Sequence, residues 1–216
     1  MAKLFPSLIS ADLLALRESI RSLDPWCSGY HLDIMDNHFV ANLTWGPMFI
    51  DAIAQATNNQ LWVHLMVDDP VLWLTKLPVR DGTVVSFHIE SSIGVQKIID
   101  DICAKKWLPS LAISPKKPLE KILPFLGSVY QVLVMSVEPG FSGQLFMPEA
   151  IGRLETVAEY RAKNKLSFRL AVDGGIKESM IADLVALGVD DFAIASGIFG
   201  ESDPVGVVKR MSILVE

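Results

Sequence analysis

The chain has 216 residues, a mass of 23.8 kDa, a net charge of −6 and a pI of about 5.2. Its 50% hydrophobic and 20% charged residues exclude a disordered chain, and no apolar run approaches the roughly 18 residues of a membrane span. The acidic balance lacks the basic footprint of a protein that binds nucleic acid or anionic lipid, so neither is an expected partner.

Eight apolar runs of strand length alternate with amphipathic segments along the chain. This alternation predicts parallel β/α architecture. Eight strand–helix units favour a closed (β/α)₈ TIM barrel, which reaches this length as one domain spanning 1–216. In chain order the predicted strands are 4–9, 30–35, 61–67, 83–89, 108–113, 130–137, 168–172 and 191–195.

The segments between the predicted strands carry signals for helix starts and ends. No linker rich in Gly, Ser or Pro interrupts them, which indicates that there is no domain boundary. The predicted helices are 13–23, capped by Asp12; 70–77, opened by Asp69 and Pro70; 94–105; a short helix after Lys116; 148 to about 163; 177–187, ended by Gly188; and a last helix from Asp203 and Pro204.

The cysteines and the N-terminal residues indicate the cellular compartment. Cys27 and Cys103 lie far apart and form no CxxC pattern, which is typical of reduced thiols in the cytosol. The first apolar stretch is broken by Pro6, Ser7 and Asp12, so it does not fit a signal peptide. The sequence therefore predicts a cytoplasmic protein.

Ionisable side chains lie on the inner face of the predicted barrel. His31 and Asp33 share one face of the second strand because side chains alternate along a strand. His64 lies on the inner face of the third strand, and Asp173 ends the seventh. Two imidazoles and two carboxylates are therefore aimed at one cavity, at the end of the barrel where such folds hold their active sites.

An unpaired carboxylate is expensive to bury, and a divalent metal removes that cost. Two histidines with two aspartates accept zinc, iron, manganese or cobalt. The alternative is a pair of hydrogen-bonded core histidines, with Asp173 as the N-cap of a helix. Because all four residues converge on one end of the barrel, a metal site is the favoured interpretation.

Glycines follow three neighbouring strands, at Gly140 and Gly143, at Gly174 and Gly175, and after Ser196. Glycine lets backbone N–H groups approach an anion closely, and the loops after strands seven and eight are the usual phosphate site of these barrels. The alternative for each loop alone is an ordinary turn. Three such loops side by side predict that a phosphate is bound there.

The remaining candidates have two open interpretations each. Ser7 could bond a substrate or its own backbone. The methionines of strands two, three and six, at positions 35, 66 and 135, could line the site or only fill the core. For His88 and Glu90, at the end of strand four, a solvated loop is favoured over a role in the site.

Six blocks, taken together and in this order, resemble the ribulose-phosphate 3-epimerase family. They are PSLISADLL (6–14), HLDIMDNHFVANLTWGP (31–47), HLMVDDP (64–70), VMSVEPGFSGQLFMPE (134–149), VDGGI (172–176) and ASGIFGESDP (195–204). The resemblance implies a ribulose-phosphate-binding barrel with one catalytic divalent metal held by His31, Asp33, His64 and Asp173. It also implies that Asp33 and Asp173 are the acid/base pair.

The resemblance further implies which residues meet the substrate. Ser7 and His64 would contact the sugar, while Met35, Met66 and Met135 would flank the reaction centre. The loops that close over the sugar and hold its phosphate would contain Gly140, Phe141, Ser142, Gly143, Gly174, Gly175 and Ser196.

Three positions depart from the family pattern. Asn37 stands where the family usually has Gly, and asparagine tolerates a positive φ better than most residues. Ala41 replaces a usual Pro, which we expect to loosen that loop. Ala195 replaces a Gly and could crowd the phosphate.

The implied reaction is epimerisation at C3 of a phosphorylated ketose, D-ribulose 5-phosphate to D-xylulose 5-phosphate, by two aspartates through a metal-stabilised enediolate. The alternatives are epimerisation of allulose 6-phosphate and an inactive barrel kept for binding or assembly. A decarboxylase or aldolase of the same fold is disfavoured, because strands two and three carry no lysine. The family also implies a homo-oligomer, either a dimer or a hexamer.

Overall fold

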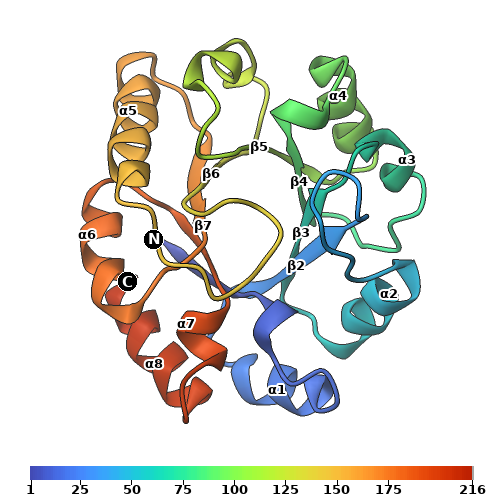
Figure 1. Ribbon diagram of the computed structural model, residues 1–216, viewed down its shortest axis with the longest axis vertical. Helices are drawn as coiled ribbons and strands as arrows, with labels where there is room; N and C mark the ends of the chain where they lie inside the picture. The colour runs from blue at the N-terminus through green and yellow to red at the C-terminus, as the bar shows by residue number, and fades with distance from the viewer. Residues whose placement is uncertain (216) are drawn as a thin grey trace.

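A computed structural model describes residues 1–215, and it contains all eight predicted strands in one parallel sheet of order β1-β8-β7-β6-β5-β4-β3-β2. An isolated parallel bridge between Ser7 and His31 joins the end of β1 to β2, so the sheet curls into a nearly closed barrel (Figure 1). The TIM-barrel prediction is confirmed. The strands are β1 Lys3–Pro6, β2 Gly29–Met35, β3 Gln60–Met66, β4 Val84–His88, β5 Leu108–Ile113, β6 Gln131–Met135, β7 Arg169–Asp173 and β8 Asp191–Ile194.

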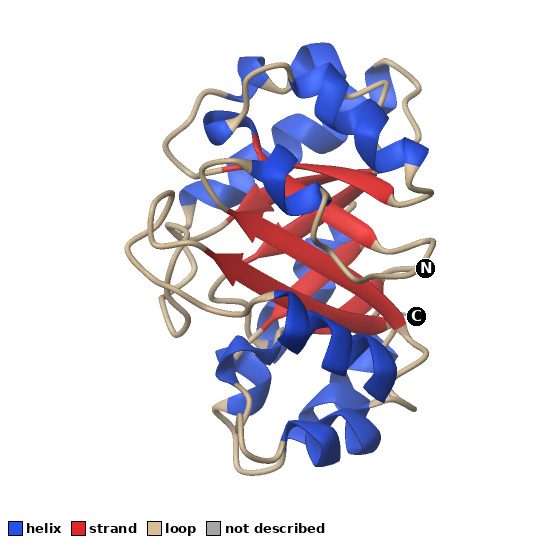
Figure 2. Ribbon diagram, turned by 90° about the vertical axis from the view of Figure 1, so that its right-hand side faces the viewer, coloured by secondary structure: helices blue, strands red, loops and turns tan. Residues whose placement is uncertain are grey.

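Helices cover the outside of the barrel. In Figure 2 the strand arrowheads and the loops that follow them lie on one side, and both chain termini lie on the other. The α-helices are α1 Leu16–Leu23, α2 Pro47–Ala56, α3 Pro70–Leu74, α4 Val95–Ala104, α5 Glu149–Lys163, α6 Ile181–Ala186, α7 Ser196–Phe199 and α8 Pro204–Leu214. The 3₁₀ turns are η1 Leu8–Ser10, η2 Ile89–Ser91, η3 Leu119–Lys121, η4 Leu123–Phe125 and η5 Glu178–Met180.

Two predicted boundaries near the start of the chain are wrong. β1 ends at Pro6 rather than at residue 9, because Leu8–Ser10 form the 3₁₀ turn η1. α1 begins at Leu16 rather than at residue 13. The Asp12 carboxylate accepts a hydrogen bond from the N–H of Leu14, but this closes a turn ahead of the helix instead of capping it.

Two predicted helix caps are confirmed. The carboxylates of Asp69 and Asp203 accept hydrogen bonds from the N–H groups of Leu72 and Gly206, which have no partner within a first helical turn. α3 nevertheless ends at Leu74, and the N–H groups of Thr75 and Lys76 bond to carbonyls three residues earlier, as in a tightened last turn.

Other helical segments were either not predicted or contain 3₁₀ turns where α-helix was expected. α2 and α7 have no predicted counterpart, and no side chain caps either of them. The short helix after Lys116 consists of two 3₁₀ turns, η3 and η4, next to Pro118 and Pro124. The segment 177–187 divides into η5 and α6 before Gly188, whose φ of 92° ends the helix as predicted. That residues 1–216 form one domain stays a prediction.

Side-chain alternation separates the core into two layers. Leu32, Ile34 and Leu65 point outward and pack beneath the helices, in the larger apolar cluster. A smaller cluster fills the inside of the barrel, and its largest members are Phe5 and Trp62. The outward layer holds the helices in place, so the inward layer is free to carry polar groups toward the end where the strands finish.

A chain of buried hydrogen bonds crosses the barrel interior beneath that end. Trp62 donates through Nε1 to Ser86 Oγ at 2.7 Å, Ser86 donates to Ser110 at 2.7 Å, and Ser110 donates to Gln131 Oε1 at 2.7 Å. The Gln131 amide then donates to Asp191 Oδ2 at 2.8 Å. All five residues are at most 1% exposed, so every lost link would leave a buried polar group without a partner.

We predict that Ser110→Ala lowers the free energy of unfolding by about 1–3 kcal/mol, because Ser86 and Gln131 would each lose a buried partner. Urea unfolding of the variant and the parent measures the difference. Ser128→Ala is the control, since Ser128 is exposed and its loss should change stability by less than about 0.5 kcal/mol. Equal midpoints for all three proteins would contradict the prediction.

Candidate functional site

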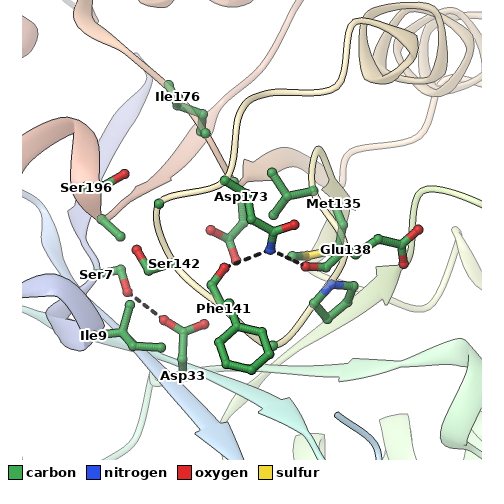
Figure 3. Close-up of a pocket in the computed structure, with 18 of the residues that line it drawn as sticks. Ser7, Ile9, Asp33, Met135, Glu138, Phe141, Ser142, Asp173, Ile176 and Ser196 are labelled. Atoms are coloured by element: carbon green, nitrogen blue, oxygen red, sulfur yellow. Dashed lines mark hydrogen bonds between the residues drawn. The ribbon is translucent and has the colours of Figure 1, made fainter. Parts of the chain in front are cut away.

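A pocket opens where the strands end, and Figure 3 shows the side chains that line it. The carboxylates of Asp33 and Asp173 face this pocket, whereas His31 and His64 lie fully buried behind its wall. The structure brings together here every other residue that the sequence proposed for the substrate: Ser7, Met35, Met66, Met135, Gly140, Phe141, Ser142, Gly143, Gly174, Gly175 and Ser196.

The four proposed metal ligands lie close together. Asp33 and His64 are direct neighbours in the register of β2 and β3, and Asp173 is the last residue of β7. His64 Nδ1 lies 3.5 Å from Asp33 Oδ1 and 3.4 Å from Asp173 Oδ2. His31 Nδ1 lies 3.3 Å from Asp33 Oδ2. One ligand atom from each of the four residues fits within a mutual distance of 4.8 Å.

These four residues fit a divalent cation. Both ring nitrogens of His31 and the Nδ1 of His64 are buried without a hydrogen-bond partner. Buried polar atoms are almost always satisfied, so three orphaned nitrogens beside two carboxylates form a group that could hold a positive ion. The alternative of hydrogen-bonded core histidines does not describe His31. Asp173 caps no helix either, because it ends a strand.

The electrostatics of the cluster also reflect unbalanced negative charge. Burial raises the pKa of Asp33, but His31 and His64 outweigh burial and hold that pKa well below its usual range. Burial lowers the pKa of His64, but the carboxylates of Asp173 and Asp33 reverse this and raise the pKa to about 9. A proton on His64 therefore balances the carboxylates when no metal is bound.

Hydroxyl groups fix both aspartates. Ser7 donates through Oγ to Asp33 Oδ2 at 2.6 Å rather than to its own backbone (Figure 3), and Thr44 donates to the Asp33 carbonyl at 2.5 Å. Ser136 donates to the carbonyls of Asp173 and Gly174, at 2.8 and 2.6 Å. Both carboxylates are thus held on anchored backbone. That Ser7 also contacts the sugar stays a prediction.

The loop between β6 and α5 covers the pocket. Within it, the Gln144 amide donates to the carbonyls of Glu138 and Phe141, at 2.7 and 2.8 Å. Two other loops hold its tip, residues 140–143. Asn42 donates to the Gly140 carbonyl at 2.7 Å, and the hydroxyls of Ser10 and Ser142 lie 2.5 Å apart. The sequence reasoning did not assign Ser10 or Asn42, because neither contact is local in the chain.

Backbone N–H groups suited to an anion lie beside this loop. Gly174 and Gly175 have φ values of 117° and 64°, which favour glycine. A Cβ on Gly175 would lie 2.3 Å from the Phe146 nitrogen, so no other residue fits there without a shift. Neither glycine N–H donates to another backbone group among residues 1–215. Both N–H groups are therefore available to a bound anion.

The three departures from the family pattern have small local effects. Asn37 adopts a φ of 60°, as expected for asparagine in place of glycine, and its N–H donates to the Asn42 carbonyl at 2.9 Å. Ala41 is exposed in a loop that Asn42 ties to Gly140. Ala195 has a φ of −100°, so its backbone does not require glycine.

The favoured interpretation of His88 as part of a solvated loop is wrong. His88 is fully buried, and its Nε2 lies 2.9 Å from the Nε2 of His64. The alternation of side chains along β4 predicts that His88 points inward, because it lies two residues beyond Ser86, which also points inward. Glu90 follows it closely and lies 3.1 Å from its Nδ1.

Sequence comparisons identify similar proteins along nearly the whole chain. The sequence model of the ribulose-phosphate 3 epimerase family matches residues 3–199. A ribulose-phosphate 3-epimerase of Methanocaldococcus jannaschii is 35% identical over 98% of this chain and 90% of its own length. The cytoplasmic isoform of ribulose-phosphate 3-epimerase from Oryza sativa subsp. japonica is 37% identical over 100% of this chain and 95% of its own length.

Similar solved structures support the fold alone. KGPDC from Streptococcus mutans has a TM-score of 0.72 at 14% identity, over 100% of this chain and 97% of its own. Thiamine phosphate pyrophosphorylase from Pyrococcus furiosus has a TM-score of 0.65 at 15% identity, over 99% and 95%. Among residues 1–215, no helix has the length and apolar character needed to cross a membrane.

We predict that the affinity of the cluster for Co²⁺ or Zn²⁺ rises about tenfold per pH unit between pH 6.5 and 8.5, because the metal must displace a proton from His64. The sign follows from the pKa of about 9: below it, protons compete for Nδ1, and above it they do not. Competition with a chromophoric chelator measures the affinity. A pH-independent affinity would contradict the assignment of this proton to His64.

Proposed function

Because the chain belongs to the ribulose-phosphate 3-epimerase family, which consists of isomerases, we propose that it interconverts D-ribulose 5-phosphate and D-xylulose 5-phosphate. The observation that carries this proposal is the buried group of two histidines and two aspartates with three unpartnered ring nitrogens. Such a group at the mouth of a barrel suits chemistry that develops negative charge on a bound substrate.

Epimerisation at C3 removes a proton next to a carbonyl and returns one to the opposite face. We assign the two proton transfers to Asp33 and Asp173. Asp33 comes from β2 and Asp173 from β7, which are not neighbours in the sheet, so the two carboxylates approach a bound sugar from different sides. One Oδ takes the proton from C3 while the other carboxyl group donates its own, and the reverse reaction exchanges the roles.

His31, Asp33, His64 and Asp173 would hold one divalent metal, and this donor set suits zinc, iron, manganese or cobalt. When bound, the metal supplies positive charge that stabilises the negative charge developing on the substrate oxygens. The same two aspartates would therefore bind the metal and move protons. Ser7 keeps Asp33 oriented through the hydrogen bond to Oδ2.

The phosphate would bind the N–H groups of Gly174, Gly175 and Ser196, in the loops after β7 and β8. Binding there positions C3 between the carboxylates, because a remote contact reduces the freedom of the reacting carbon. Met35, Met66 and Met135 give the pocket an apolar wall, and the loop tip 140–143 would shield a bound sugar from water.

Location and assembly complete the proposal. We propose a cytoplasmic enzyme, which the name of the rice relative supports. We also propose a homo-oligomer, either a dimer or a hexamer. Exposed apolar side chains after β2 and β4 support it, since Leu43, Met48 and Ile93 are 70%, 88% and 98% exposed.

The test of the function is a parallel assay on D-ribulose 5-phosphate and allulose 6-phosphate, with metal content measured on the same sample. We expect faster turnover of the pentose phosphate, loss of activity on chelation and recovery when metal returns. Faster turnover of allulose 6-phosphate would instead favour the hexose-phosphate alternative. Turnover of neither substrate by metal-loaded protein would favour an inactive barrel.

We predict that Asp33→Asn and Asp173→Asn each lower kcat by about 10²–10⁴-fold, because an amide keeps the shape but moves no proton. In D₂O the parent enzyme should leave deuterium at C3 of the product, since the acid exchanges with solvent. Metal content must be measured in each variant, because both residues are proposed ligands. Asp183→Asn, at an exposed helix position, is the control. A variant that keeps its metal and the parent rate would exclude that residue as acid or base.

We predict that Ser196→Asp raises KM for the phosphorylated substrate by about tenfold or more, because a carboxylate repels the phosphate, and about 1.4 kcal/mol is tenfold in affinity. Ser202→Asp adds the same charge at an exposed position outside the pocket and should leave KM near the parent value. Initial rates over a range of substrate concentrations give both constants. An unchanged KM for Ser196→Asp would place the phosphate elsewhere.

A further inference from the structure

A line of hydrogen-bonding groups leads away from His64 on the side opposite the aspartates. His64 Nε2 lies 2.9 Å from His88 Nε2, and the two rings stack with an interplanar angle of 18°. Both residues are fully buried, and the ring of Phe39 lies 4.8 Å from that of His88. At 2.9 Å one nitrogen must donate and the other accept, since two hydrogens would clash and two lone pairs would repel.

Glu90 decides which nitrogen donates. Its Oε2 lies 3.1 Å from His88 Nδ1, and its Oε1 accepts from the N–H of Ser114 at 2.7 Å. A carboxylate only accepts, so His88 carries its hydrogen on Nδ1 and leaves Nε2 bare. His64 must then donate through Nε2–H. Its Nδ1 faces Asp33 and Asp173, and this is the nitrogen that would give up its proton and offer a lone pair to the metal.

We propose that His88 and Glu90 are positioning residues that select the tautomer of His64 and thereby present its Nδ1 to the metal. The inference rests on the proposed metal site and adds residues that do not touch the metal or the substrate. Partners on the far nitrogen of a ligand histidine commonly change metal affinity by about 10–100-fold.

His31 provides an internal contrast. Neither of its ring nitrogens has a hydrogen-bond partner, and the edge of its ring meets Trp62 at a centroid distance of 4.7 Å and an angle of 85°. Asp33 Oδ2 lies 3.3 Å from its Nδ1 and Asp173 Oδ2 lies 4.0 Å from its Nε2, and both carboxylates belong to the cluster itself. Among residues 1–215, no hydrogen-bonding group from outside the cluster selects the tautomer of His31. Of the two histidines in the cluster, only His64 is prepared by a chain of donors and acceptors.

The charge state of Glu90 agrees with this direction. Burial raises its pKa, but the hydrogen bond from His88 and the N–H of Ser114 outweigh burial and hold the pKa at about 2. Glu90 is thus an acceptor across the physiological range, and the chain of hydrogen bonds keeps one direction.

Substitutions at His88 separate the hydrogen bond from the volume of the ring. His88→Phe keeps the size and accepts nothing, whereas the amide oxygen of His88→Gln accepts from His64 Nε2–H. We expect His88→Phe to weaken Co²⁺ binding by about 10–100-fold and His88→Gln to recover most of the loss. His38→Gln changes an exposed histidine of a neighbouring loop and should leave the affinity unchanged.

Glu90→Gln replaces one oxygen by an NH₂ group and should reverse the direction of the hydrogen bonds from Glu90 through His88 to His64. The N–H of Ser114 requires an oxygen opposite it, so the new amide nitrogen faces His88 Nδ1 and donates to it. His88 then donates from Nε2, and His64 is left with its hydrogen on Nδ1, where the metal should bind. We expect weaker Co²⁺ binding, by about tenfold or more, together with an altered visible absorption of the bound Co²⁺.

Chelator competition with Co²⁺ measures all of these affinities, and thermal unfolding of each metal-free variant checks its fold. Should His88→Phe fail to fold, Glu90→Gln decides alone. Parent affinity in Glu90→Gln, or equal losses in His88→Phe and His88→Gln, would overturn the inference while leaving the metal site intact. Failure of the parent protein to bind stoichiometric Co²⁺ would instead overturn the proposed function, and this inference with it.

Discussion

Two carboxylates buried beside two imidazoles must be balanced by positive charge, and the arrangement of the site follows from that requirement. Desolvated carboxylates are too costly to leave alone, so the cluster holds either a proton on His64 or a metal ion. Ser7 offers Asp33 one neutral donor, but a hydroxyl adds no charge. Binding of the proposed metal would therefore couple to release of the His64 proton.

The closed sheet makes such a cluster possible. Because alternate side chains point inward, a barrel can present Asp33 and His64 from paired positions on two adjacent strands, with His31 two residues earlier on the same face of β2. The chain of hydrogen bonds from Trp62 to Asp191 continues the polar groups through the barrel interior, in space that aliphatic side chains usually fill. The interior thus carries many polar groups, while the helices gain their packing from the outer face.

Periodicity and strand order were sufficient to predict the barrel and to bring the four proposed ligand residues together. The eight strands and the inward faces of β2 and β3 depend on local pattern, which the sequence displays. The contact between Asn42 and Gly140 depends instead on how two loops meet across 98 residues, which no local pattern records. The start of α2 was missed because Gly46 offers no capping side chain. His88 was misjudged because alternation was not extended along β4.

The covering loop has a consequence for the timing of catalysis. Among residues 1–215, side chains from outside the loop bond its tip, 140–143, through Asn42 and Ser10 alone, and one such neutral hydrogen bond contributes only about 0.5–1.5 kcal/mol. Lifting the tip therefore breaks little and leaves the barrel untouched, so it belongs with loop motions of microseconds to milliseconds. Such a tip can shield a reactive carbanion from bulk water during each turnover and still release the product quickly. If the chain acts as proposed, the strength of these two hydrogen bonds would help to set how long a sugar stays enclosed.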